Sequence, residues 1–305
     1  MSMNRTNWED MASVSDRLDR WLHLRLPEFS MARVRELIES GRVRVNGFTA
    51  KKGTRVKPED IVTVRDLEPG LLPRPDEIEI DVVYADDRVM VVDKPAGMAT
   101  QPLSPEERGT LVNAVLFREP GLRGVGDKPL EPGLVHRLDA GTSGLVLFAK
   151  DPAALIFFRR ELEMRRMDKT YRALVRGETP ARGEIRVALA HHPTDPGLMV
   201  PAEKDADYRG EPFPALTRYR TLATEGGVSL VELDLVTGVT HQLRVHLAHL
   251  GFPELGDDRY GDRPNRDSRR FALQAARLVF AHPDGHQRIV ARVSRELSIE
   301  DRKRF

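Results

Sequence analysis

Gly-Leu-Val-His-Arg-Leu-Asp-Ala-Gly-Thr-Ser-Gly, residues 133–144, is the stretch that says most about the fold. A short apolar lead is followed by His136, Arg137 and Asp139, and then by a glycine-flanked segment. A carboxylate on such a loop between two strands can project into a cleft, where loops held by a scaffold usually place catalytic groups. The plainer interpretation is a turn in which Asp139 caps its own backbone and Arg137 is a surface charge. Spacing alone favours the plainer interpretation, because short clusters of this kind arise often.

Two further segments carry candidate site residues. Residues 169–175, Lys-Thr-Tyr-Arg-Ala-Leu-Val, predict a strand on which Tyr171, taken alone, is better explained as a core aromatic. Residues 235–251 predict a strand, a tight turn, Thr240 as a cap and a short helix that ends at Gly251. Arg244 lies beside the apolar stripe of that helix, so it needs a carboxylate partner if it is buried.

Outward from these segments, the pattern predicts strands separated by loops, with few helices. Period-two alternation begins at Ile78, which indicates a strand over residues 78–82. Further strands are expected at 88–92, 144–149, 171–176 and 229–236, and helices at 110–116, 152–165 and 241–250. This succession predicts an α+β domain over residues 78–305, with a mixed, mainly antiparallel sheet and flanking helices.

Ahead of that domain, residues 15–67 are predicted to form a small α/β domain, after an N-terminal extension at 1–14 and before a linker at 68–77. Ser15 or Asp16 is expected to cap its first helix, and Ser30 its second. Residues 42–45 alternate strictly before Asn46-Gly47, a strong tight-turn signal, and a strand over 61–64 closes the domain.

The basic residues of this small domain are concentrated between Phe29 and Lys57, although the whole chain has a net charge of only +1. Eight basic residues stand there against Glu36 and Glu39, a local net charge of +6. The eight are Arg33, Arg35, Arg42, Arg44, Lys51, Lys52, Arg55 and Lys57. Such a block is usually a solvated face, but on an ordered domain it favours a polyanionic partner, so the domain is predicted to bind RNA.

Composition excludes several classes of protein. The chain has 305 residues, 40% hydrophobic and 31% charged, which fits two domains of ordinary soluble composition. It has no run of eighteen apolar residues, and its polar, acid-bearing start does not resemble a signal peptide, so a cytoplasmic location is expected. It has no cysteine, which removes disulfides, thiolate nucleophiles and cysteine-bearing zinc sites. No exposed heptad pattern is visible, so a monomer is expected.

Taken together, the three segments resemble the family of large-subunit ribosomal RNA pseudouridine synthases. Its hallmarks are His-Arg-Leu-Asp followed by Thr-Ser-Gly, a Lys-x-Tyr-x-Ala-Leu-Val strand, and Thr-Gly-x-Thr-His-Gln-x-Arg-Val-His-Leu. Residues 91–97, 109–114 and 256–261 also match, and all six segments stand in the expected order. Residues 15–64 resemble the small ribosomal-protein-like RNA-binding module that many members carry in front. One departure is that Val239 stands where family members usually have arginine.

The resemblance implies an enzyme that isomerises specific uridines of structured RNA to pseudouridine, with large-subunit ribosomal RNA as the first expectation. The reaction breaks the bond from the base nitrogen to the sugar, turns the base and rejoins it through ring carbon five, so it needs no cofactor and no metal. It does need a charged carboxylate as nucleophile or base. The resemblance assigns that role to Asp139, with Arg244 as its charge partner and Tyr171 against the base.

The target base must also leave its stack, and the resemblance makes Arg137 the side chain that fills the gap. The other residues expected to contact RNA are Arg17, Arg33, Arg35, Arg42, Arg44, Lys51, Lys52, His136, Lys169 and Thr240.

Rival hypotheses fit less well. His-Arg-Leu-Asp is similar to a kinase catalytic loop, but Leu138 is inserted and no glycine-rich phosphate loop is present. A zinc base deaminase needs a cysteine pair, and the glycines near residue 124 lack dinucleotide spacing. His241, His246 and His249 have no acidic residue in register for a metal. Two alternatives stay open: a transfer RNA substrate, and a non-catalytic ribosome-assembly protein that has kept the fold.

Overall fold

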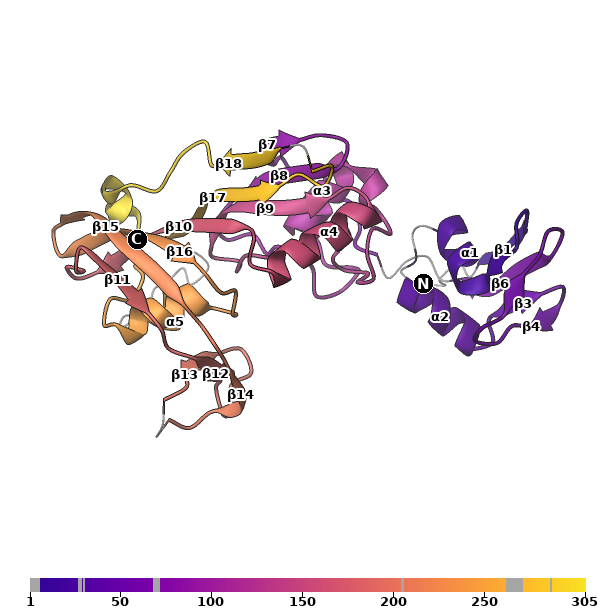
Figure 1. The fold of residues 1–305 in the computed structure, drawn as a ribbon, viewed down its shortest axis with the longest axis horizontal. Helices are drawn as coiled ribbons and strands as arrows, with labels where there is room; N and C mark the ends of the chain where they lie inside the picture. Colours follow the sequence, from indigo (N-terminus) through magenta and orange to yellow (C-terminus); the bar gives the residue numbers. More distant parts are fainter. Residues whose placement is uncertain are drawn as a thin grey trace. The chain divides into compact units, whose positions relative to one another are not determined.

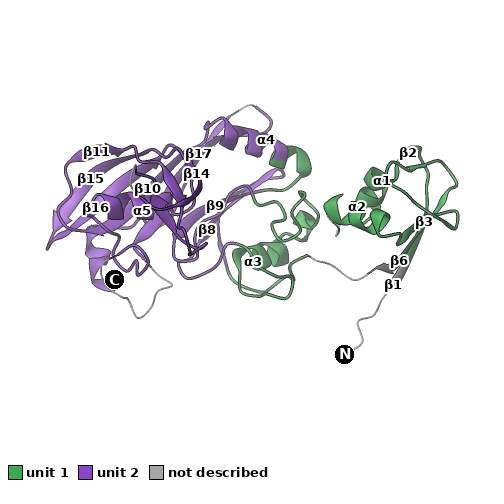
Figure 2. Cartoon of the chain, turned by 90° about the horizontal axis from the view of Figure 1, so that it is seen from below, with its two compact units in different colours: residues 1–79, 101–134, 149–155 green, residues 80–100, 135–148, 156–305 purple. Residues whose placement is uncertain are grey.

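The structure, a computed structural model, describes residues 6–26, 29, 31–67, 72–203, 206–261, 271–285 and 287–305. The chain divides into two compact units (Figure 2). Unit 1 comprises residues 1–79, 101–134 and 149–155, and unit 2 comprises residues 80–100, 135–148 and 156–305. Unit 1 therefore extends beyond the expected small domain, while Asp139, Tyr171 and Arg244 all lie in unit 2.

The small domain of unit 1 has two helices and two short sheets. Its elements are β1 (Thr6–Met11), β2 (Asp16–Arg17), α1 (Leu18–Arg25), α2 (Met31–Glu39), β3 (Val43–Val45), β4 (Phe48–Thr49), β5 (Arg55–Val56) and β6 (Ile61–Leu67). One sheet has the order β1-β6-β3-β4, and β2 pairs with β5. The apolar stripes of both helices pack on this sheet through buried side chains such as Trp21, Leu37 and Val64. Burial of each such side chain stabilises the domain by about 1.5–3 kcal/mol.

Two details of the small domain differ from the sequence prediction. Residues 6–11, expected in an extension, pair with β6. Neither Ser15 nor Asp16 caps α1, because Asp16 and Arg17 instead form β2. Arg17 occupies the N-cap position, and its side chain makes no capping hydrogen bond. Ser30, the expected cap of α2, lies outside the described residues. The predicted turn is present, with positive φ at Asn46 and Gly47.

The second half of the expected linker is hydrogen-bonded within unit 1. Asp76 accepts from Arg108 at 2.6 Å and from the backbone N–H of Gly109 at 3.1 Å. The side chain of Asn113 donates to the carbonyl of Arg74 at 2.7 Å. Asn113 also completes a capping box at the start of α3 (Leu111–Arg118). Residues 74–76 are therefore tied to the residues around this helix.

Unit 2 is built on a nine-stranded sheet (Figure 1). Its strands are β7 (Asp81–Ala85), β8 (Val89–Lys94), β9 (Ser143–Ala149), β10 (Asp168–Arg176), β11 (Arg182–Ile185), β15 (Thr217–Glu225), β16 (Val228–Leu235), β17 (Leu273–Ala281) and β18 (Arg288–Arg292). The order is β11-β15-β16-β10-β17-β9-β8-β7, with β18 also pairing with β17. Most of its pairs are antiparallel, and β9 runs parallel to β17. The predicted fold class is confirmed. It is a mixed, mainly antiparallel sheet with flanking helices, and a small α/β domain precedes it in the sequence.

Helices pack on this sheet at two places. In α4 (Pro152–Glu163), the ring of Phe158 meets that of Phe280 on β17 edge to face, 5.5 Å between centroids. In α5 (Gln242–His249), Gln242 and His246 both hydrogen-bond to Thr217 at the start of β15. These buried polar contacts fix α5 against the end of β15.

A glycine brings the loop of residues 135–142 close to the centre of the sheet. Gly144 pairs with Ala275 on β17, and its φ of 112° is one that side-chain-bearing residues rarely adopt. A Cβ atom at this position would stand 2.3 Å from the carbonyl oxygen of Ala275. Only glycine fits this approach, so Gly144 sets how closely the start of β9 lies to β17.

Other strands differ from the sequence prediction. The strand predicted over 78–82 begins later in the structure, as β7, Asp81–Ala85. No sequence signal indicated β12 (Leu189–His191), β13 (Met199–Pro201) and β14 (Arg209–Phe213), which form a small sheet of their own between β11 and β15. β12 and β13 have three residues each and β14 has five, so no period-two pattern develops.

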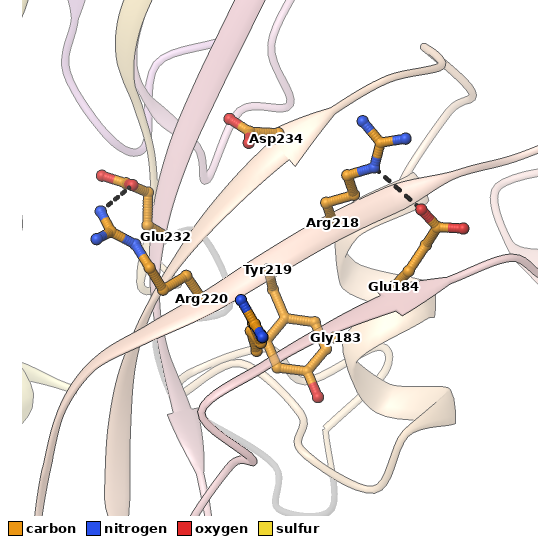
Figure 3. A pocket seen from close by; sticks show the side chains of 8 residues that line it. Gly183, Glu184, Arg218, Tyr219, Arg220, Glu232 and Asp234 are labelled. Carbon is orange, nitrogen blue, oxygen red and sulfur yellow. Dashed lines mark hydrogen bonds and ion pairs between the residues drawn. The ribbon is translucent and has the colours of Figure 1, made fainter.

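A groove of about 470 Å³ lies on β11, β15 and β16 (Figure 3). Its charged lining consists of Arg182, Arg218, Arg220, Glu184, Glu232 and Asp234. Arg218 contacts Glu184 at 3.0 Å, and Arg220 contacts Glu232 at 2.8 Å. Because its positive and negative side chains balance, this groove presents no net charge to a polyanion.

None of the helices in the described ranges combines the length and apolar character needed to cross a membrane.

Candidate active site

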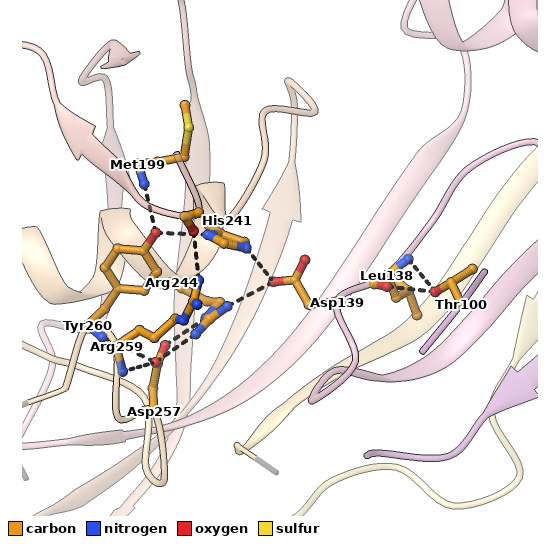
Figure 4. A network of polar contacts seen from close by, with 10 residues as sticks. Thr100, Leu138, Asp139, Met199, His241, Arg244, Asp257, Arg259 and Tyr260 are labelled. Carbon is orange, nitrogen blue, oxygen red and sulfur yellow. Dashed lines mark hydrogen bonds and ion pairs between the residues drawn. The ribbon is translucent and has the colours of Figure 1, made fainter. Parts of the chain in front are cut away.

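Residues 94–100 hydrogen-bond to the backbone of the loop that carries Asp139. The buried hydroxyl of Thr100 donates to the carbonyl of Leu138 at 2.6 Å and accepts from its N–H at 3.2 Å (Figure 4). The backbone N–H of Gly97 donates to the carbonyl of Ala140 at 2.8 Å. The fully buried ammonium of Lys94 donates to the same carbonyl at 3.2 Å. Asp139 therefore projects from a segment whose backbone is fixed on both sides.

Arg244 of α5 joins two carboxylates (Figure 4). Its Nη1 contacts Oδ2 of Asp139 at 3.1 Å, so the pairing implied by the sequence is present. Its Nε and Nη2 donate to Oδ2 and Oδ1 of Asp257, both at 2.8 Å. The side chain of Asp257 is 1% exposed and that of Asp139 is 31% exposed. Asp257 thus anchors the arginine, and Asp139 is the carboxylate that solvent or a ligand can reach.

Aromatic rings and charge keep Arg244 in one orientation. Its guanidinium lies 4.2 Å from the ring centroid of Phe271 and 5.0 Å from that of Tyr260. The ring of Phe271 fits because residue 141 is glycine: a Cβ there would meet it at 2.3 Å. Burial disfavours the charge, but the hydrogen bonds and charge of Asp257 outweigh this and raise the pKa of Arg244. A permanent positive charge therefore stands beside Asp139.

His241 and Tyr260 lie on another side of Asp139. Nδ1 of His241 is 2.8 Å from the Tyr260 hydroxyl, and its Nε2 is 3.7 Å from Oδ2 of Asp139. The Tyr260 hydroxyl also accepts from the backbone N–H of Met199 at 2.9 Å. Burial lowers the pKa of His241, which favours the neutral imidazole.

Tyr171 is buried on β10, in register with the residue of β17 that pairs with Gly144 at the end of the Asp139 loop. It pairs with Leu233 on one side and with Ala275 on the other, and Ala275 pairs with Gly144. The register of β10 against β17 shifts between Thr170 and Tyr171, a bulge of the kind that re-aims side chains beside active sites. Burial, and then the charge of Asp139, raise the pKa of Tyr171, so its hydroxyl stays protonated.

The remaining site candidates of unit 2 differ in exposure. Arg137 and Thr240 are exposed. Lys169 is half-buried, and burial lowers its pKa. His136 accepts from the backbone N–H of Leu147 at 3.3 Å, and burial lowers its pKa to about 3, so it is uncharged. Its expected contact with RNA would therefore not be an ionic one.

One detail at the start of α5 corrects the sequence prediction. Thr240 does not cap the helix, because His241 takes the N-cap position in a left-handed conformation with φ 55° and ψ 17°. Val239, at the position where arginine is usual in the family, is half-buried and packs with Leu189 and Met199. An apolar contact thus replaces a charge at this position.

The candidates of the small domain are partly neutralised by acids. Asp19 contacts both Arg17 at 2.9 Å and Arg35 at 3.3 Å. Arg33 pairs with Glu36, and Lys52 approaches Glu39 at 3.7 Å. Arg44 donates to the carbonyl of Gly47 at 3.4 Å, Arg42 is half-buried, and Lys51 is exposed.

Sequence reasoning missed four side chains that build the site: Asp257, His241, Tyr260 and Lys94. Asp257 and Tyr260 lie in the segment 256–261, which was matched but given no role. The need of a buried arginine for a carboxylate was the signal available for Asp257.

The three histidines of the 241–249 segment have separate partners. His246 contacts Thr217 and the carbonyl of Val187, and His249 lies 3.5 Å from Glu203. In the part of the chain that the structure describes, no group of metal-ligating side chains forms.

The site consists of a half-exposed carboxylate on a rigid loop of a mixed sheet, and a buried arginine fixes that carboxylate. This arrangement is typical of enzymes that use nucleophilic catalysis and electrostatic stabilisation. Residues 88–249 match the family model described as RNA pseudouridylate synthase, and residues 16–62 match the S4 domain. The chain belongs to the RNA pseudouridylate synthase family. It is an RNA pseudouridine synthase, an isomerase, and its S4 domain binds RNA.

Known relatives extend over most of the chain. It is 42% identical over 277 residues to an uncharacterised RNA pseudouridine synthase of Chloroflexus aurantiacus, covering 88% of this chain and 83% of the relative. It is 32% identical over 290 residues to ribosomal large subunit pseudouridine synthase D of Pasteurella multocida, covering 90% and 86%. The solved structure of human RNA pseudouridylate synthase domain containing 1 matches with a TM-score of 0.59 at 28% identity, covering 75% of this chain and 86% of that one.

Proposed function

We propose that this enzyme converts one or more uridines of large-subunit ribosomal RNA to pseudouridine, with Asp139 as the catalytic carboxylate. The observation that carries the proposal is the ion pair of 3.1 Å between Arg244 and Asp139 on a loop fixed by Thr100. The substrate class is supported by the similarity to a relative named for the large ribosomal subunit, over nine-tenths of the chain.

Asp139 acts in its charged form, as nucleophile or as base. Arg244 holds the carboxylate by one oxygen and, through Asp257, is itself unable to turn away. Such a fixed charge needs no reorganisation when the nucleotide arrives, which is how preorganised sites lower a barrier. The partial exposure of Asp139 leaves room for the nucleotide.

Tyr171 and Arg137 have different roles in the proposal. Tyr171, buried and protonated one row from the Asp139 loop, offers a flat apolar surface for the uracil ring. Arg137, exposed two residues before Asp139, fills the stack from which the uridine leaves. Extrusion of a base costs a few kcal/mol, so a side chain that replaces it lowers the cost of reaching the site.

The test is a map of pseudouridine in total RNA from cells that lack the gene and carry either the wild-type enzyme or Asp139→Asn. We expect sites in large-subunit ribosomal RNA to appear with the wild type and to be absent with the variant. The variant keeps the shape of the side chain but loses its charge and nucleophilicity. Purified Asp139→Asn should bind RNA as the wild type does. Sites confined to transfer RNA would overturn the substrate, and turnover of the variant within tenfold of wild type would remove Asp139 from the mechanism.

A further inference from the structure

We propose that His241 is a positioning residue of this reaction: Tyr260 holds its imidazole as the Nε2–H tautomer, and that N–H is directed at the oxygen of Asp139 that Arg244 already binds. The inference rests on the proposed role of Asp139. It also assigns the reacting oxygen, since two donors at Oδ2 leave Oδ1 to the nucleotide.

The backbone of His241 is the first sign of a functional constraint. Its φ of 55° and ψ of 17° place it in the left-handed region, where side-chain-bearing residues are uncommon. Such a conformation is unfavourable for a residue with a side chain and persists where the surroundings impose it. Here the surroundings are the Tyr260 hydroxyl on one ring nitrogen and Asp139 on the other. The strained backbone therefore aims one small ring at two partners.

The Tyr260 hydroxyl has a single hydrogen to donate, and this determines the tautomer of His241. Its oxygen accepts from Met199 N–H at 2.9 Å, and its single hydrogen needs an acceptor. Nδ1 of His241, at 2.8 Å, provides that acceptor only when it carries no proton. If Nδ1 were protonated, the phenol hydrogen would have no acceptor that the described residues are seen to provide. Because Tyr260 is half-buried with its hydroxyl between Met199 N–H and His241 Nδ1, Nδ1 is the acceptor of the phenol hydrogen and the imidazole hydrogen lies on Nε2.

The Nε2–H faces an oxygen that is already anchored. Nε2 stands 3.7 Å from Oδ2 of Asp139, and Arg244 Nη1 stands 3.1 Å from the same atom. A separation of 3.7 Å is longer than a hydrogen bond, but catalytic contacts are often long without substrate and tighten when it binds. No donor to Oδ1 is seen among the described residues. Oδ2 therefore orients the carboxylate, and Oδ1 presents its lone pair.

A neutral donor suits this position better than a second cation. The charged or titratable groups that face His241 are Asp139, Arg244, Arg259, Asp257 and Tyr260. Burial lowers the pKa of His241, and the two arginines lower it further, against the opposing effect of the carboxylates. The imidazole can thus orient Asp139 without adding a positive charge that would weaken it as a nucleophile or base.

The test uses two substitutions that break the arrangement at different points. His241→Asn tolerates the left-handed backbone, and its side-chain oxygen stands close to where Nδ1 stands, so it keeps the Tyr260 contact and loses only the reach to Asp139. Tyr260→Phe keeps the ring beneath Arg244 and removes the hydroxyl that selects the tautomer. His249→Asn, an exposed histidine on the same helix, is the matched control.

We expect His241→Asn to lower the single-turnover rate at saturating RNA by about 10- to 100-fold, the scale on which small misplacements act. RNA affinity should stay within twofold, and His249→Asn should behave as wild type. Because Tyr260 acts on this rate through His241, adding Tyr260→Phe to His241→Asn should cause no further loss. Nitrogen NMR of the wild-type ring should show Nδ1 unprotonated, and Tyr260→Phe should give a mixture of tautomers.

Three results would overturn the inference: a His241→Asn rate within twofold of wild type, losses from the two substitutions that multiply, or a protonated Nδ1. If His241→Asn does not fold, Tyr260→Phe and the NMR assignment of the wild-type ring still test the role of His241. Asp139→Asn, assayed beside them, distinguishes a failure of this inference from a failure of the proposed function. If it is inactive while His241→Asn is active, only this inference fails; if it is active, the proposed function fails.

Discussion

At the scale of single residues, the site depends on one buried arginine shared by two carboxylates. The pairing of Asp139 with Arg244 joins residues 105 positions apart, and composition and spacing could not predict it. The family motifs implied this pair, whereas the second carboxylate, Asp257, lies in a matched segment to which the sequence assigned no role. Sequence motifs therefore pointed to Asp139 and Arg244, and the structure adds Asp257, the carboxylate that keeps Arg244 charged and oriented.

The shared arginine leads to a prediction on stability. Arg244→Ala should lower the free energy of unfolding by about 3–5 kcal/mol, because Asp257 would be left as an unpaired buried charge. Urea denaturation measures the loss. Asp257→Asn, added to Arg244→Ala, should restore part of it by removing that charge. A double variant less stable than Arg244→Ala alone would contradict this account.

Glu254 gives a prediction on pH. It is buried, and neither carboxylate oxygen has a hydrogen-bond partner among the described residues. Burial, and then the charge of Asp257, raise its pKa well above the ordinary 4.5. The folded enzyme therefore keeps a proton that the unfolded chain releases above about pH 4.5, so this residue destabilises the fold increasingly as pH rises from that value to the raised pKa.

Glu254→Met should then be more stable than wild type at pH 8, by about 1–3 kcal/mol, because an apolar side chain removes the unpaired carboxyl. The advantage should shrink towards pH 5, and thermal unfolding at both pH values measures it. Glu254→Gln serves as the control that removes the titration but keeps a buried polar group. A stability difference that does not change with pH would show that Glu254 is not the titrating group.

At the scale of elements, regular patterns were predicted well and short irregular ones were not. The helix expected over 152–165 is α4, Pro152–Glu163, and the strand expected over 229–236 is β16, Val228–Leu235. α4 has buried residues at helical spacing, and β16 has a nearly continuous buried run over residues 229–233. The small sheet of β12, β13 and β14 went unpredicted, although Met199 of that sheet bonds to Tyr260 in the site. Its stability comes from contacts distant in sequence, which local patterns do not record.

The Asp139 loop gives a prediction at this scale. Thr100→Val keeps the shape of a buried side chain but loses the hydroxyl that bonds both backbone groups of Leu138. We expect a loss of about 1–3 kcal/mol in stability, because both groups are left unpaired. Turnover should fall more than RNA affinity, since the loop beneath Asp139 loosens. Thr100→Ser keeps the hydroxyl and should retain most of the activity; if it is as slow as Thr100→Val, the hydroxyl is not the cause.

At the scale of the whole molecule, the S4 domain and the proposed catalytic residues lie in different parts of the chain. The basic residues of the S4 domain lie between Arg17 and Lys57, and the proposed catalytic residues lie in unit 2. The net charge of +1 hides this division, because unit 2 carries charge-balanced surfaces such as the groove on β11, β15 and β16. The local net charge, not the total, pointed to the RNA-binding part.

This division predicts a selective loss when the basic S4 residues are removed. Replacing Arg44, Lys51 and Lys52 together by glutamine should weaken binding to a long structured RNA. Each ionic interaction with a phosphate that the substitution removes should reduce the slope of log affinity against log salt by about 0.7–0.9. Turnover at saturation on a short fragment that bears only the target uridine should hardly change, because that fragment occupies unit 2 alone. The matched control is Arg182, Arg218 and Arg220 replaced by glutamine in the charge-balanced groove, which removes the same charge and should leave the salt slope close to wild type. If the S4 variant instead loses turnover on the short fragment and keeps its affinity for long RNA, the S4 domain is part of the catalytic unit and does not anchor RNA separately.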